Sequence, residues 1–145
     1  MRIRLVMLGK TRRTELRALL EDYAARIRHH ADLEIVELRK APAPHRSGRA
    51  LEFAAGATLV LLDVAGKTHD SESFARWLAG LRDSGTRELV FLCGDAEGFP
   101  EELRRRAALK LSLTPLTLSH ELARVVLAEQ LYRAFAILSG SPYPK

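Results

Sequence analysis

The residues that could bind a small molecule stand at the ends of three strand-like segments. Leu62 closes one apolar run, Gly94 follows a second, and a loop rich in leucine and threonine at 113–118 follows a third. Ligands of open α/β sheets bind beyond the carboxyl ends of the strands, where a glycine lets a ligand approach the main chain. A leucine-rich loop is poorly suited to solvent but forms a good wall for a ligand. The sequence therefore predicts a small-molecule site at one edge of a sheet.

Other kinds of site lack their characteristic residue patterns. Gly94 and Gly98 do not have the spacing of a dinucleotide-binding loop, and Gly66-Lys67 lacks the earlier glycine of a P-loop. The sequence has no nucleophile elbow, no ordered Ser/His/Asp set and no cluster of metal ligands. Cys93 is its single cysteine. We therefore expect neither hydrolytic chemistry, nor a metal ion, nor a disulfide.

Strand and helix patterns alternate along the 145 residues and would bring these segments together. Period-two alternation and continuous apolar runs indicate strands, and apolar residues at helical spacing indicate helices. We expect strands at 2–7, 33–38, 58–62, 89–93 and 109–113, and helices at 14–30, 49–55, 71–84, 100–108 and 120–138. This alternation predicts a single α/β domain, residues 1–145, with a mostly parallel sheet covered by helices on both faces.

Two further segments have unusual composition. The segment 41–48 contains two prolines and basic residues, so we expect a mobile loop that either connects its neighbours or covers a substrate. The helix at 120–138 is apolar on nearly every side. We therefore expect it to pack on its own sheet and also on a second copy of the chain.

Composition and charge limit the class of protein and its partners. Hydrophobic residues make up 47% of the chain and charged residues 28%, which is typical of a globular domain. The formal net charge of +5 permits a polyanionic partner such as RNA. No apolar run approaches the roughly 20 residues of a membrane span, and the chain begins directly with a strand pattern rather than a signal peptide. We therefore expect a cytoplasmic protein without a membrane partner.

Several motifs, taken together, resemble those of a known family. They are Leu62-Asp63-x-x-Gly66-Lys67, Gly94-x-x-Glu97-Gly98, Leu111-Ser112-Leu113-x-x-Leu116-Thr117-Leu118-x-His120, and the ending Glu129-Gln130-Leu131-Tyr132-Arg133-Ala134-Phe135 with Pro142-Tyr143. Over its whole length the sequence is similar to the small methyltransferases that modify N3 of a pseudouridine in 23S ribosomal RNA, which belong to the SPOUT superfamily. The carboxyl-terminal third carries the specific part of the resemblance.

The resemblance implies a carboxyl-terminal trefoil knot that binds S-adenosylmethionine, and a homodimer whose substrate enters between the protomers. It implies large-subunit ribosomal RNA as the substrate, on assembled ribosomes. By the family pattern, the cofactor would contact the following residues: Leu62, Gly94, Leu113, Thr114, Pro115, Leu116, Thr117 and Leu118.

Methyl transfer to N3 of a uracil-type base requires the loss of a weakly acidic proton. A nearby cation favours the deprotonated base, and positioning supplies much of the remaining acceleration. From the matching carboxyl-terminal motif, we expect Arg133 to stabilise the anionic base and Tyr143 to position it or to help remove its proton. Arg133 could instead form an ordinary helix-surface pair with Glu129. We expect a structural role for His120, whereas Arg124 could contact RNA phosphate or cap a loop.

Two residues depart from the family pattern. Pro144 stands where the family has a histidine after the tyrosine, and Asp95 replaces the second glycine of a pair. These departures keep two other functions open. One is methylation of another RNA, such as tRNA, and the other is a noncatalytic module that binds RNA or the ribosome and has kept the fold.

Overall fold

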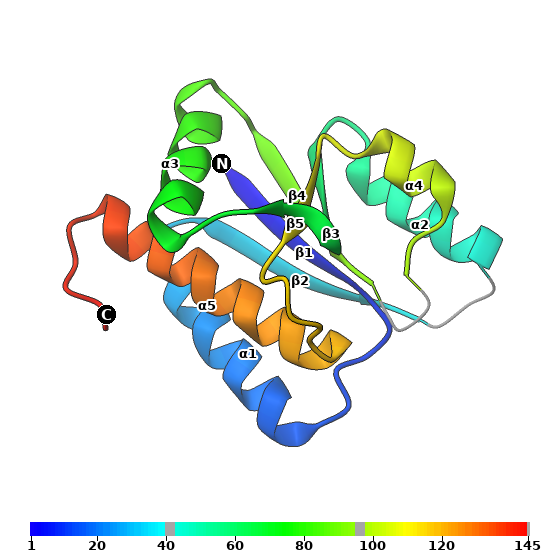
Figure 1. Ribbon diagram of the computed structural model, residues 1–145, viewed down its shortest axis with the longest axis horizontal. Helices are drawn as coiled ribbons and strands as arrows, with labels where there is room; N and C mark the ends of the chain where they lie inside the picture. The colour runs from blue at the N-terminus through cyan, green and yellow to red at the C-terminus, as the bar shows by residue number, and fades with distance from the viewer. Residues whose placement is uncertain (40–42, 95–97, 145) are drawn as a thin grey trace.

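The computed structural model describes residues 1–39, 43–94 and 98–144, with the main chain alone for 43–47. Five strands alternate with five helices within these residues (Figure 1). Their bounds are β1 Arg2–Leu8, α1 Thr14–Ile27, β2 Asp32–Leu38, α2 Ala43–Ala54, β3 Thr58–Thr68, α3 Ser71–Asp83, β4 Glu88–Cys93, α4 Glu101–Arg106, β5 Leu109–Ser112 and α5 His120–Leu138.

The strands form one sheet in the order β2-β1-β4-β3-β5, and each neighbouring pair is parallel. Helices α1, α3 and α5 cover one face, while α2 and α4 cover the other (Figure 1). This confirms the predicted α/β fold with a parallel sheet between two helical layers. The trefoil knot and the single-domain organisation stay predictions.

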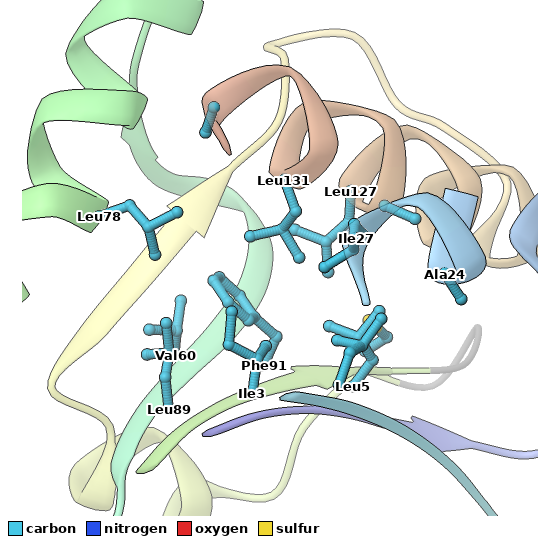
Figure 2. Close-up of a cluster of buried hydrophobic side chains, with 14 of the residues drawn as sticks. Ile3, Leu5, Ala24, Ile27, Val60, Leu78, Leu89, Phe91, Leu127 and Leu131 are labelled. Carbon is cyan, nitrogen blue, oxygen red and sulfur yellow. The ribbon is translucent and has the colours of Figure 1, made fainter. Parts of the chain in front are cut away.

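Each face of the sheet has its own hydrophobic core. Ile3 and Phe91 point toward the larger core, where they meet Leu127 and Leu131 of α5 (Figure 2). Val6 lies in the smaller core under α2 and α4, whereas its neighbours in β1, Leu5 and Met7, lie in the larger one. The alternation of side chains along a strand sends neighbouring residues to opposite faces. Strands β1 and β4 are therefore apolar along most of their length, as expected for buried parallel strands.

Helix α5 is covered largely by its own chain. Leu127, Ala128 and Leu131 are fully buried against the sheet, and α1 and α3 pack along its two sides. Leu122 and Ile137 remain 39% and 40% exposed on its outer face. Much of the apolar surface of α5 is thus buried without a partner, so the second copy of the chain stays a prediction.

The expectation of a loop at 41–48 is wrong from Ala43 onward, because α2 begins there rather than near residue 49. Pro44 lies in the first turn, where the missing N–H has no intrahelical acceptor to lose. Residues 41 and 42 lie outside the described part of the chain. Helix α4 is shorter than expected, because Ala107 is extended and the Ala108 N–H donates to the Leu59 carbonyl, which leads the chain into β5.

Strand β3 extends six residues beyond the predicted end at Leu62, to Thr68. Its pairing with β5 shifts register between Leu62 and Lys67, so that both residues pair with Leu111. At this crossing Gly66 lies directly on the main chain of β5. A Cβ atom on Gly66 would be 2.5 Å from the Lys110 carbonyl oxygen. The extension of β3 therefore requires a residue without a side chain at this position.

We predict that Gly66→Ala destabilises the protein by about 1–3 kcal/mol, the usual range for an overpacked site. The added methyl group would collide with main-chain atoms of Lys110 and Leu111, which cannot move aside as a flexible side chain could. The measurement is the free energy of unfolding from urea titration. Gly80→Ala in α3 is the control, because a Cβ there meets open space and alanine favours a helix. Equal stability of the two variants would contradict the prediction.

Candidate functional site

A cavity of about 480 Å³ opens beside the middle of β3, beyond the ends of β4 and β5, where α5 begins. Leu62 lines it from β3, and Gly94 lines it after β4. The loop 113–118 closes another side with each of its residues except Pro115. The three segments singled out from the sequence therefore meet around one space, although Leu62 lies within β3 and not at its end. That they hold a cofactor stays a prediction.

Gly94 occupies a position with little room for a side chain. A Cβ atom there would be 3.1 Å from the ring of Phe99, a residue that also lines the cavity. The neighbouring Cys93 is buried, and burial raises the pKa of its thiol to about 12. Because the thiolate is the nucleophilic form of cysteine, Cys93 serves as an apolar wall and not as a reactive group. Asp95 lies outside the described residues.

The loop 113–118 is shaped by hydroxyl groups at its own ends. Ser112 Oγ donates to the Thr114 carbonyl at 3.0 Å, and the Leu116 N–H donates to Thr114 Oγ1 at 3.2 Å. Ser119 then caps α5 by accepting from the Leu122 N–H at 3.2 Å, as its residue type predicts. The leucines of the loop are left to face the cavity or solvent, and Leu116 is 75% exposed.

One ion pair at the cavity was not anticipated from the sequence. Arg104 Nη1 of α4 lies 3.0 Å from Asp63 Oδ2, and both residues line the cavity. The other Asp63 oxygen accepts from the Ala65 N–H at 3.0 Å. Arg104 stands ten residues after Gly94 in a run of three arginines, and nothing in that run distinguishes it from its neighbours. Only the packing of α4 over the strand ends selects it.

His120 lies at the edge of the same cavity, at the start of α5. Its Nε2 atom is 4.0 Å from Glu121 Oε2. Arg124, one turn further along the helix, is fully buried and donates to Thr11 Oγ1 and to the Leu8 carbonyl. Of the two roles considered for Arg124, the structure supports the one that holds a loop, because a fully buried guanidinium does not reach a phosphate.

Arg133 and Tyr143 lie together at the other end of α5. Arg133 Nε donates to Glu129 Oε1 at 3.0 Å, and its guanidinium carbon stands 4.8 Å from the centre of the Tyr143 ring. Arg133 also donates to the Pro144 carbonyl. Tyr132 packs edge-on against Tyr143, with ring centres 4.6 Å apart. The structure therefore contains the helix-surface pair with Glu129, and it also brings the two predicted catalytic residues into contact.

The environment of Tyr143 keeps its phenol protonated. Its hydroxyl lies 3.4 Å from the hydroxyl of Tyr23 and from Glu129 Oε1. Burial, the contact with Tyr23 and the negative charge of Glu129 raise the pKa of Tyr143 above its ordinary value, and Arg133 only partly opposes them. A phenol with a raised pKa is a hydrogen-bonding group at neutral pH and a poor base.

These two groups do not meet the cavity within one chain. Arg133 follows His120 by thirteen positions on one helix, which at a rise of about 1.5 Å per residue is about 20 Å. The predicted catalytic residues and the predicted cofactor residues therefore lie toward opposite ends of α5, the helix drawn in orange in Figure 1.

The described residues contain no group of three or more His, Cys, Asp or Glu side chains that could hold a metal ion. No helix among them is long and apolar enough to cross a membrane.

Solved structures share this fold at low sequence identity. A protein of Haemophilus influenzae described as a "probable methylase family protein" superposes with a TM-score of 0.62 at 12% identity, covering 99% of this chain and 70% of that one. The SpoU methyltransferase AviRb of Streptomyces viridochromogenes, solved with its cofactor AdoMet, gives a TM-score of 0.51 at 17% identity, covering 96% of this chain and 58% of that one. These likenesses support the fold.

The sequence comparisons are closer and span the chain. Proteins named "Ribosomal RNA large subunit methyltransferase H" are 45% identical in Pelobacter propionicus, over 99% of both chains, and 39% identical in Gemmatimonas aurantiaca, over 100% of both. The family model described as "Predicted SPOUT methyltransferase" matches residues 1–144. With a cavity formed by three neighbouring parallel strands and a match along nearly its whole length, this chain belongs to the SPOUT methyltransferase family.

Proposed function

We propose that the protein transfers a methyl group from S-adenosylmethionine to N3 of a pseudouridine in large-subunit ribosomal RNA, in the cytoplasm and on assembled ribosomes. The observation that carries the proposal is the cavity, which gathers the residues expected to bind the cofactor in a member of this family. The proposed RNA substrate is taken from the names of the relatives that match along their full length.

The cavity fits the chemistry of S-adenosylmethionine. An adenine ring requires a flat apolar slot, which Leu62, Leu113 and Leu118 offer. The charged end of the molecule requires polar partners, and Arg104 and Asp63 provide a cation and an anion at the cavity wall. The bound cofactor supplies a methyl group on a positively charged sulfur. The chain's own residues must hold that group, exclude water and present the base.

Arg133 and Tyr143 are proposed to act on the base. Loss of the N3 proton leaves a negative charge, and a guanidinium beside it favours that charged form. Arg133 keeps this charge firmly, because its hydrogen bond with Glu129 raises its pKa. Tyr143, protonated at neutral pH, is proposed to donate a hydrogen bond that orients the base. The structure therefore favours positioning over proton removal for Tyr143.

A second copy of the chain is proposed to complete the site. About 20 Å of helix separates Arg133 from the cavity of its own chain, so a partner that places the far end of its own α5 beside this cavity would bring these groups together. The outer face of α5 offers Leu122 and Ile137 for such a contact. In a two-fold dimer each surface meets its own copy, so both cavities would be completed at once.

The proposed function predicts the loss of one methyl group from 23S ribosomal RNA when the gene is deleted. Mass spectrometry of ribosomal RNA from the deletion strain would show an unmethylated pseudouridine, and the gene in trans would restore it. The tRNA fraction, measured alongside, should be unchanged. Loss of a methyl group from tRNA instead would favour the other RNA substrate. The absence of S-adenosylmethionine binding at high micromolar concentration in calorimetry would favour a noncatalytic module.

A mixture of two inactive variants tests the composite site. Arg133→Ala removes the proposed cation, and Gly94→Val places a side chain against Phe99 and narrows the cavity. We predict that each variant alone is inactive. After unfolding and refolding together they should recover about a quarter of the wild-type rate, because half of the dimers are mixed and each mixed dimer has one intact site.

The readout is the transfer of labelled methyl groups to ribosomes that lack the modification. Each variant refolded alone is the control. Calorimetry should show that Arg133→Ala still binds S-adenosylmethionine. No recovery in a mixture that sedimentation shows to contain dimers would exclude a site shared between protomers.

Tyr143→Phe separates positioning from proton removal. We predict that kcat falls about tenfold, the loss expected for one hydrogen bond of about 1.4 kcal/mol, and that the pH profile of kcat keeps its shape. The control is Tyr132→Phe, since the Tyr132 hydroxyl makes no hydrogen bond to the described residues and its ring is retained. If the pH profile of kcat for Tyr143→Phe lacked one titrating group that the wild-type profile shows, Tyr143 would be identified as the base.

A further inference from the structure

A short basic loop joins β1 to α1, comprising residues 9–13 and running beside the start of α5 (Figure 1). Its central residue, Thr11, is 1% exposed. Its N–H donates to Glu37 Oε2 at 2.6 Å, its carbonyl accepts from Arg17 Nη2 at 2.6 Å, and its hydroxyl accepts from Arg124 Nη1 at 2.9 Å. Every polar group of Thr11 is thus engaged, by β2, α1 and α5, so the basic loop is fixed in place.

The next two residues are fixed to the edge of the cavity. The N–H groups of Arg12 and Arg13 both donate to Glu121 Oε1, at 2.8 and 3.0 Å. These hydrogen bonds, of which the one from Arg13 has the larger effect, lower the pKa of Glu121 below its ordinary value, so the carboxylate stays charged. Glu121 directly follows His120, which lines the cavity. The basic loop therefore lies beside the proposed cofactor site.

The side chains of the basic loop face solvent without partners in the described part of the chain. Lys10, Arg12 and Arg13 are exposed, and none forms an ion pair or a side-chain hydrogen bond with a described residue. Many other arginines have partners, as Arg26 has in Asp22 and Arg104 in Asp63. Exposed arginines without such a pair among the described residues, such as Arg76 and Arg87, are not clustered. Three cations within four residues repel one another, and the fixed main chain keeps the points from which their side chains extend close together. Such an arrangement is stabilised by a ligand with several closely spaced negative charges.

We infer that the basic loop binds the phosphate backbone of the RNA next to the nucleotide that enters the adjacent cavity. Three exposed cations on a fixed main chain match a row of phosphates, which contact proteins mainly through lysine and arginine. The inference rests on the proposed function, from which the RNA substrate is taken. It adds which surface of the protein binds that RNA. The protomer that forms the cavity would bind the phosphate backbone of the RNA, while its partner would contribute the residues proposed to contact the base.

The test replaces Lys10, Arg12 and Arg13 together by glutamine. This change removes three positive charges but keeps the main-chain N–H groups that Glu121 accepts. The control variant replaces Arg76, Arg82 and Arg87 by glutamine. These residues are also exposed and carry the same charge, but they lie on α3 and on the segment before β4, away from the cavity.

Two quantities are measured for each full-length variant. The first is the KM and kcat of methyl transfer to ribosomes that lack the modification, and the second is ribosome binding by sedimentation at several salt concentrations. We expect the loop variant to raise KM about tenfold or more and to lower the slope of log affinity against log salt by about 2–3, since each lost phosphate contact contributes about 0.7–0.9. Its affinity for S-adenosylmethionine, measured by calorimetry, should stay within about twofold of the wild type.

The outcomes separate the inference from the proposed function. A loop variant with the KM and salt slope of the wild type would overturn the inference, as would an equal loss in the control variant, which would indicate a general charge effect. If the wild type does not methylate ribosomes but binds them through the basic loop, the inference stands and the proposed reaction fails. A last outcome concerns a purified acidic protein at low salt. If the loop variant loses binding to that protein but still binds ribosomes like the wild type, the surface binds a protein partner and the inference is wrong.

Discussion

The contact between Gly66 and the main chain of Lys110 is the constraint on which the proposed site depends. Strand β3 can continue past its register shift only because position 66 has no side chain, and this continuation lies directly over β5. The end of β5 then leads at once into the loop 113–118, beside Leu62. A single close approach between two main chains thus brings two walls of the cavity together, although the segments are more than forty positions apart.

Helix α5 determines how the remaining parts are distributed. It begins at the cavity and carries Arg133 near its far end, and a helix packed between the sheet, α1 and α3 cannot bend to bring them together. The rigidity that stabilises the protomer therefore keeps the proposed cofactor site and the proposed base-contacting residues apart. Under the proposed function, the need for two copies follows from this separation, more than from the apolar surface of α5, most of which is buried within one chain.

Buried polar contacts fix the other side of the cavity. Arg124 is a fully buried cation, and its Nη1 atom lies 3.7 Å from Glu37 Oε2 and 2.9 Å from Thr11 Oγ1. Burying a charge is costly unless it is paired, so this network contributes less to stability than to a defined geometry. What it defines is the path of residues 9–13, which lie next to the first turn of α5. Of the two roles that the sequence left open for Arg124, RNA contact and capping a loop, the structure supports the second, because Arg124 positions the basic loop. We infer that the exposed cations of that loop contact the RNA.

The sequence by itself determined the alternation of strands and helices, the apolar runs in β3 and β4, the cap at Ser119 and the three segments that line the cavity. These features follow from local periodicity and residue type, which act over a few neighbours. It did not determine the extension of β3 through Gly66, the start of α2 at Ala43, the Asp63–Arg104 pair or the burial of Arg124. Only the tertiary structure decides these features, because each depends on which distant segment packs against a residue. Local sequence patterns do not specify such long-range contacts.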